Sequence, residues 1–275
     1  MAVRRQGVRK RGVGAFTLVE LLVVVALMGV LVGLMLPTLG RARQAARQVV
    51  CQAHLRSWGL GFSAYAVENG DCWPHTDGLD RQDASVAPRT PADRADYYGW
   101  VDVLAPLMGE RAWRDYPLGE RPGPGSVFQC AAARLGPTEL YGYDAKRLGW
   151  FSYAMNSCLE LDENCWRNEE EPGRVMPSFL KVSLIRGPEQ VILLFDQLLD
   201  PRLGYDGKAM NRSAGRHCGS YPKAFSARHG RGPDERGGSI LHCDGHVDWA
   251  ASVWKPDWPV DLEVPPRSDR EWFPY

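Results

Sequence analysis

Residues 15–36 read AFTLVELLVVVALMGVLVGLML, and this stretch decides the fold. It holds 22 residues and a single charged side chain, that of Glu20. At about 1.5 Å rise per residue, a helix of this length spans roughly 30 Å, the thickness of the hydrocarbon core of a bilayer. Because lipid offers the backbone no hydrogen-bond partners, a segment that crosses it must be helical. The stretch therefore predicts a transmembrane helix.

The charges on the two sides of this stretch predict its orientation. Residues 1–15 carry five basic side chains and no acidic one, whereas residues 16–275 carry 28 basic and 33 acidic side chains, a net charge of −5. Basic residues beside a membrane helix stay in the cytoplasm. We therefore expect a cytoplasmic N-terminus and a larger part outside. The zero formal charge of the whole chain argues against a nucleic-acid binder.

Glu20 is the feature that a plain membrane anchor does not explain. A carboxylate inside an apolar helix costs several kcal/mol unless it is paired, so such an acid marks a functional position. A secretory signal peptide has a shorter apolar region, about 7–15 residues. The alternative for Glu20 is an acid close enough to the interface to reach the headgroups by snorkelling.

Residues 14–20, GAFTLVE, follow a short basic leader and resemble the type IV prepilin signature of pilins and type II secretion pseudopilins. The resemblance implies that a prepilin peptidase removes the leader on the cytoplasmic side and methylates the new amine of Phe16. Glu20 is then the fifth mature residue. Pro37 is the 22nd, where the family usually has a helix-kinking proline. The resemblance also implies that Glu20 pairs with the amine of a neighbouring subunit and sets the subunit register.

The cleavage site has two alternatives in this sequence. The family usually has glycine immediately before the phenylalanine, but here Ala15 stands between Gly14 and Phe16. Cleavage after Ala15 keeps Glu20 at the fifth position, and cleavage after Gly14 shifts it by one. The register favours Ala15.

After Pro37 the sequence predicts that the helix continues as an amphipathic one. Apolar residues recur at spacings of three and four, which is helical periodicity. They are Leu39, Ala42, Ala46, Val49 or Val50, and Ala53. Asn69-Gly70 is a favourable helix end. We expect five segments: a basic leader (1–15), a transmembrane helix (16–37), an amphipathic helix (38–69), an α+β head (70–255) and an irregular tail rich in proline and tryptophan (256–275).

Short apolar runs in the head predict strands. The clearest is residues 191–195, VILLF, bounded by a proline and an aspartate. Residues 239–249 predict a β-hairpin, because Asp244-Gly245 suits a two-residue turn. Further short elements are expected at 97–109 (a buried helix), 127–130 (a strand) and 150–156 (a strand). The predicted fold is α+β and pilin-like, with the long N-terminal helix packed on an antiparallel sheet.

A second resemblance covers more of the chain. Several segments are similar to a group of bacterial pilin-like proteins that carry a His…Asp-Gly motif near the C-terminus. The motif would comprise His229, Asp244, Gly245 and His246, and its role is unknown. Fourteen residues separate His229 from Asp244 where the usual form has nine, which implies a loop insertion of five. The other similar segments are Cys51 with Leu55-Arg56 and Tyr65, residues 128–130, 152–156 and 194–196, and Arg228.

The chain has seven cysteines, so at least one is free or pairs between molecules. A domain outside the cytoplasm can oxidise them. Cys158 and Cys165 flank an acidic stretch and could close it as a disulfide. Other pairings that the sequence leaves open are Cys51–Cys130, Cys51–Cys72 and Cys218–Cys243. Several buried free thiols are the alternative.

The sequence predicts neither a cofactor nor an enzyme. No Cys-x-x-Cys occurs, which argues against a zinc ribbon. His and Cys gather over residues 217–246, and His242 and His246 have the i, i+4 spacing of helical zinc ligands, but the Asp-Gly turn between them breaks a helix. We therefore expect no metal. The alternative is calcium in an acidic loop or another divalent ion, although no calcium spacing is met. None of the common hydrolase or nucleotide-binding motifs is present.

These features predict a structural subunit of the bacterial inner membrane. It would be single-pass and processed by prepilin peptidase. Its helix would assemble with other pilin-like subunits into a type II secretion or type IV pilus-like structure. The head would lie in the periplasm or outside the cell, and no nucleic acid would be a partner. The alternative is a membrane-tethered extracytoplasmic ligand-binding domain that uses prepilin processing only for sorting.

Overall fold

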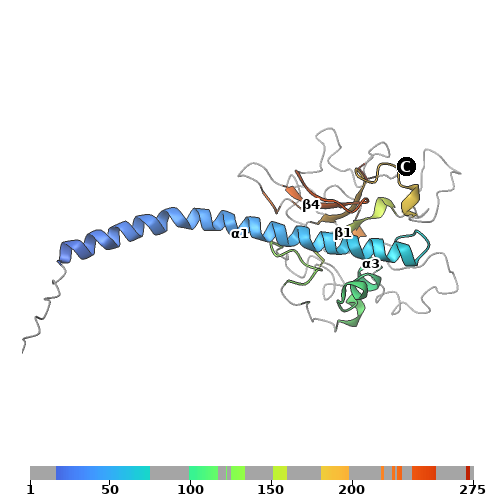
Figure 1. The fold of residues 1–275 in the computed structure, drawn as a ribbon, viewed down its shortest axis with the longest axis horizontal. Coiled ribbons are helices and arrows are strands. Elements are labelled where there is room, and N and C mark those ends of the chain that lie inside the picture. The colour runs from blue at the N-terminus through green and yellow to red at the C-terminus, as the bar shows by residue number, and fades with distance from the viewer. Residues whose placement is uncertain are drawn as a thin grey trace, which may run out of the picture. The chain divides into compact units, whose positions relative to one another are not determined.

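The structure is a computed structural model that forms two compact units, residues 1–43 and residues 44–275, joined within one helix (Figure 1). Each unit is described by itself. The residues that the structure describes are 17–74, 99–116, 122, 125–133, 151–159, 181–197, 218–219, 225–226, 228–230, 237–251 and 271–272.

Helix α1, Leu18–Glu68, is the longest element and confirms the predicted N-terminal helix. All its side chains in the first unit are exposed, and most of them up to Leu36 are apolar. Among the described residues, α1 is the one helix long and apolar enough to cross a membrane. The helix continues through Pro37, and the Thr38 hydroxyl donates to the carbonyl of Met35 at 2.8 Å. A kink at Pro37 stays a prediction.

In the second unit, one face of α1 is buried in the core. Its buried residues recur at helical spacing: Cys51, His54, Leu55, Trp58, Gly59, Gly61, Phe62 and Ala66. The predicted apolar stripe was wrong here, because Val49, Val50 and Ala53 are exposed. Trp58 and Phe62 determine which face is buried, because burial of a large aromatic ring removes far more apolar area from water than burial of alanine or valine does.

The sheet has five strands in the order β3-β1-β2-β4-β5. They are β1 (Tyr153–Asn156), β2 (Ile192–Asp196), β3 (Cys218–Gly219), β4 (Gly237–His242) and β5 (Val247–Ala251). Strands β1, β2, β4 and β5 pair antiparallel, as predicted. The short edge strand β3 pairs parallel to β1, which the sequence analysis did not predict. A parallel pair needs a long connection, and about 60 residues separate these two strands.

Helix α1 is covered on two sides within the second unit (Figure 1). Gly59 lies so close to β4 that a Cβ there would come within 3.0 Å of a methyl group of Leu241. Gly61 faces Leu104, at the junction of α3 (Trp100–Val103) and the 3-10 helix η1 (Ala105–Met108). These two short helices take the place of the single helix predicted over 97–109. Glycines on α1 therefore let both layers approach the helix closely.

The core beside α1 is aromatic. Trp58 packs edge-on against Trp100, with ring centroids 4.7 Å apart, and it donates from Nε1 to the carbonyl of Val127 at 2.9 Å. Residues 127–130 form turns and not the predicted strand. An alternation of apolar residues is compatible with a strand or with a turn. Here the turn places the side chains of Phe128 and Cys130 in the core. Within the described ranges, the further 3-10 helices are η2 (Trp113–Asp115), η4 (Ser157–Leu159) and η5 (Val182–Leu184).

Candidate functional site

The start of α1 forms a capping box. Thr17 precedes the first helical residue, and its hydroxyl accepts from the backbone N–H of Glu20 at 3.2 Å. In return, the Glu20 carboxylate accepts from the backbone N–H of Thr17 at 2.9 Å and from its hydroxyl at 2.8 Å. This reciprocal pattern satisfies donors that a helix end otherwise leaves unpaired. Residues Gly14, Ala15 and Phe16, predicted to be the processing site, lie outside the described residues.

The capping box gives Glu20 a local partner that the sequence analysis missed. The signal was present as Thr17-Leu18-Val19-Glu20, which matches the Thr-x-x-Glu capping pattern. The carboxylate also lies in the first turn of the helix, where the helix dipole favours negative charge. Glu20 is therefore hydrogen-bonded within its own chain.

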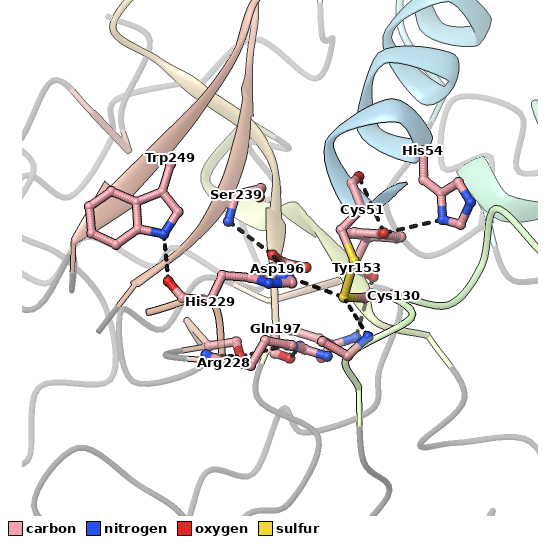
Figure 2. A network of polar contacts seen from close by, with 12 residues as sticks. Cys51, His54, Cys130, Tyr153, Asp196, Gln197, Arg228, His229, Ser239 and Trp249 are labelled. Carbon is pink, nitrogen blue, oxygen red and sulfur yellow. Dashed lines mark hydrogen bonds and ion pairs between the residues drawn. A yellow bond between two sulfur atoms is a disulfide. The ribbon is translucent and has the colours of Figure 1, made fainter. Parts of the chain in front are cut away.

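A disulfide joins α1 to the turn segment 125–133 (Figure 2). It links Cys51 and Cys130, whose Cα atoms are 5.0 Å apart, and it is one of the pairings that the sequence left open. Cys72 and Cys243 are free thiols, so the other two pairings do not form. Cys158 is buried, but Cys165 lies outside the described residues, and their pairing stays a prediction.

His229 lies against this disulfide in the interior of the second unit (Figure 2). Its Nε2 atom is 3.1 Å from the Sγ atom of Cys130 and 3.4 Å from Oδ2 of Asp196. Its backbone is held by the sheet, because the carbonyl accepts from the indole Nε1 of Trp249 at 2.6 Å and the N–H donates to Gly237. Burial lowers the pKa of His229, although Asp196 opposes that shift. The sulfur and nitrogen atoms of Cys51, Cys130 and His229 lie within 4.8 Å of one another, the spacing of a metal-ligand group.

Asp196 ends β2 and places a fully buried carboxylate beside the histidine. Its Oδ2 atom accepts from the backbone N–H of Ser239 at 2.9 Å, whereas its Oδ1 atom has no hydrogen-bond partner among the described residues. The nearby guanidinium of Arg228 donates to the hydroxyl of Ser226 at 2.7 Å and to the carbonyl of Gln197. The described residues thus give this buried carboxylate few hydrogen-bond donors.

Tyr153 closes the other side of the disulfide. Its hydroxyl lies 3.4 Å from Nδ1 of His54 and 3.4 Å from the backbone carbonyl of Cys51. Burial raises the pKa of Tyr153, and the Asp196 carboxylate raises it further. Burial also lowers the pKa of His54. Both shifts favour the neutral side chains, so Asp196 and Arg228 bring the formal charges to this centre.

The residues of the His…Asp-Gly motif are not brought together. Asp244 and Gly245 form the turn between β4 and β5, whereas His229 bonds to Gly237 at the far end of β4. A six-residue strand is about 20 Å long, which separates the two parts of the motif. The predicted hairpin is confirmed, but its loop has three residues and not two. The N–H of His242 donates to the carbonyl of His246, and Gly245 adopts a positive φ of 91°. This geometry is that of the three-residue hairpin loop, the next most common type after the two-residue loop.

The turn orders its own side chains. Partial burial acts to raise the pKa of Asp244, but the backbone N–H and the ring of His246 donate to its carboxylate and the net shift is downward. The rings of His242 and His246 stack with centroids 4.2 Å apart and an angle of 4°. Since ring-nitrogen lone pairs lie in the ring plane, two parallel rings at this distance cannot direct them at one ion about 2 Å from each.

Comparison with known proteins identifies the N-terminal segment. A search of curated proteins and a search of solved structures found no match to the chain. A protein-family model described as the prokaryotic N-terminal methylation motif matches residues 10–36. This match covers Lys10 and Arg11 before the helix, the capping box and the exposed apolar part of α1. The chain therefore carries the prokaryotic N-terminal methylation motif, consistent with a type IV prepilin-like protein.

Proposed function

We propose that this chain is a structural pilin-like subunit that is processed by prepilin peptidase, held in the bacterial inner membrane by the first part of α1, and assembled with other pilin-like subunits. The methylation motif at residues 10–36 carries the proposal. The destination would be a type II secretion or type IV pilus-like structure.

The exposed apolar surface of α1 supports an assembly role. Side chains such as Leu22, Leu31 and Leu36 are more than 60% exposed. A contiguous apolar surface of this size is unfavourable in water and marks a surface for membrane or protein contact. Lipid covers it before assembly, and apolar faces of other helices cover it in a filament.

Glu20 supports a defined register between subunits. In the single chain, its carboxylate bonds to Thr17 and faces no positive charge among the described residues. A carboxylate in an apolar environment gains several kcal/mol from a positive partner. The N-terminal amine left by peptidase cleavage of a neighbouring subunit would supply that charge, so the stagger that joins the two groups would be preferred.

The disulfide supports an extracytoplasmic location for the second unit. Disulfides persist in oxidising compartments and are rare in the cytoplasm. Cys51–Cys130 lies in the second unit, after the apolar part of α1. Together with the basic residues before the helix, this favours a cytoplasmic N-terminus and a periplasmic or extracellular second unit.

Assembly can be tested with Glu20→Gln, which keeps the size of the side chain but removes its charge. Glu68→Gln is the matched control, because it neutralises an exposed acid at the other end of α1. Both variants are expressed with prepilin peptidase and the assembly machinery, and the membrane and filament fractions are quantified. We expect normal membrane insertion of both, and at least tenfold less filament for the Glu20 variant. Equal assembly of Glu20→Gln and the wild type would refute the register role and favour a plain tether.

A further inference from the structure

We propose that Cys51, Cys130 and His229 form a binding site for Zn²⁺ in the chain whose Cys51–Cys130 pair is reduced, with the Asp196 carboxylate beside His229. The same buried position would thus hold either a disulfide or a metal ion. The dithiol form precedes oxidation in every newly made chain, so the proposal requires no cellular reductant.

The donor atoms of the three ligands already lie close together, and tetrahedral spacing is within reach of small side-chain movements. With Zn–N near 2.0 Å and Zn–S near 2.3 Å, tetrahedral neighbours lie about 3.3 to 3.8 Å apart. Nε2 of His229 is 3.4 Å from Oδ2 of Asp196 and 3.1 Å from Sγ of Cys130. The two sulfur atoms and this nitrogen all lie within 4.8 Å of one another. Opening the S–S bond lets side-chain rotations move the sulfurs apart to metal-ligand spacing.

The charges around the site call for a divalent cation once the thiols ionise. Two thiolates and the Asp196 carboxylate contribute −3, and the Arg228 guanidinium contributes +1. Burial disfavours any uncompensated charge. One Zn²⁺ brings the sum to zero.

The Asp196 carboxylate beside His229 has one unpaired oxygen. Oδ1 of Asp196 has no hydrogen-bond partner among the described residues, and water cannot reach it because the residue is 0% exposed. Leaving a buried charged oxygen unpaired costs more than a hydrogen bond contributes. A cation bound beside this carboxylate would offset its buried negative charge.

The three ligands come from three separate parts of the fold: α1, the turn segment 125–133 and the segment before β4 (Figure 2). Zinc would therefore join all three parts, as the disulfide joins the first two in the oxidised chain. Binding of Zn²⁺ to the two thiols releases two protons. After removal of Zn²⁺, thiol–disulfide exchange with a second disulfide forms the S–S bond, and that disulfide is reduced to two thiols.

The test uses the full-length protein in detergent. A phosphine reduces the disulfide, taking up one oxygen atom from water as two thiols form, and the reduced protein is dialysed against Zn²⁺ or Co²⁺. We expect one additional metal ion per chain relative to a Cys51→Ser/Cys130→Ser variant treated identically, together with thiolate-to-cobalt charge-transfer absorption. His229→Gln should lower the affinity at least tenfold. This variant can still form the disulfide, so its oxidised form shows whether it folds.

Alkylation of wild-type thiols provides a second measurement that needs no variant. In the reduced protein, Zn²⁺ should slow alkylation of Cys51 and Cys130 at least tenfold, as located by peptide mass. Cys72 is a half-buried free thiol outside the site and should react at an unchanged rate. If Zn²⁺ protects neither Cys51 nor Cys130, or if the wild type binds no more metal than the double-serine variant, the proposal is wrong.

Discussion

Removal of the Cys51–Cys130 disulfide should destabilise the second unit strongly. The bond closes a loop with a sequence separation of 79 residues. The loop-closure entropy of a chain of that length corresponds to about 4.5 kcal/mol at 25 °C. Folded domains are stable by only about 5–15 kcal/mol, so this is a large fraction of the total.

The double-mutant cycle has a distinctive signature. Cys51→Ala and Cys130→Ala each abolish the same bond, so either single variant should lose about as much stability as the double variant. The expected coupling energy is therefore about 4.5 kcal/mol in magnitude, well above that of ordinary contacts. Cys72→Ala serves as the control, because that thiol is free and only half-buried.

Chemical denaturation followed by tryptophan fluorescence can measure these changes. Trp58, Trp100 and Trp113 are fully buried in the aromatic core beside the disulfide and should report its unfolding. A chelator keeps adventitious metal from the single-cysteine variants. Losses below about 1 kcal/mol, or losses that add between the two single variants, would refute the reasoning.

Three further predictions concern other parts of the chain. Gly237→Ala should destabilise the second unit by at least about 2 kcal/mol, because a Cβ there would lie 2.0 Å from a carbonyl oxygen of β5; thermal denaturation checks this. Thr17→Val should weaken the first turn of α1 by about 1 kcal/mol and speed its amide exchange, whereas Thr17→Ser should not. Burial lowers the pKa of His54 and of His242, so the unfolded state takes up more protons and the stability should fall as the pH drops below about 6.5. A His54→Gln/His242→Gln variant should therefore lose less melting temperature than the wild type between pH 7.5 and 5.5. An unchanged slope of melting temperature against pH would contradict this assignment.

The N-terminal part was predictable because its signals are local. A continuous apolar run specifies a long helix, and the methylation motif is contiguous at residues 10–36. The strands at 153–156 and 192–196 were also visible as short apolar runs. The hairpin was predicted from Asp244-Gly245, but the loop length depends on the backbone of Gly245, which composition does not fix.

The buried centre was not predictable, because its members are far apart in the sequence. Cys51, Cys130 and Asp196 are brought together with His229 only by the packing of the helix on the sheet. The sequence grouped His229 with Asp244 through a motif, whereas the structure places them at opposite ends of β4. Likewise, helical periodicity alone did not reveal which face of α1 is buried, because small apolar residues give a stripe on more than one face.

The mass of the mature protein tests the central claim most directly. The chain is purified from cells with and without a prepilin peptidase, and its N-terminus is mapped by mass spectrometry. We predict an N-terminus at Phe16 that carries one added methyl group, and only when the peptidase is present. Recovery of the complete chain, with residues 1–15 attached, from cells that contain an active peptidase would contradict the account.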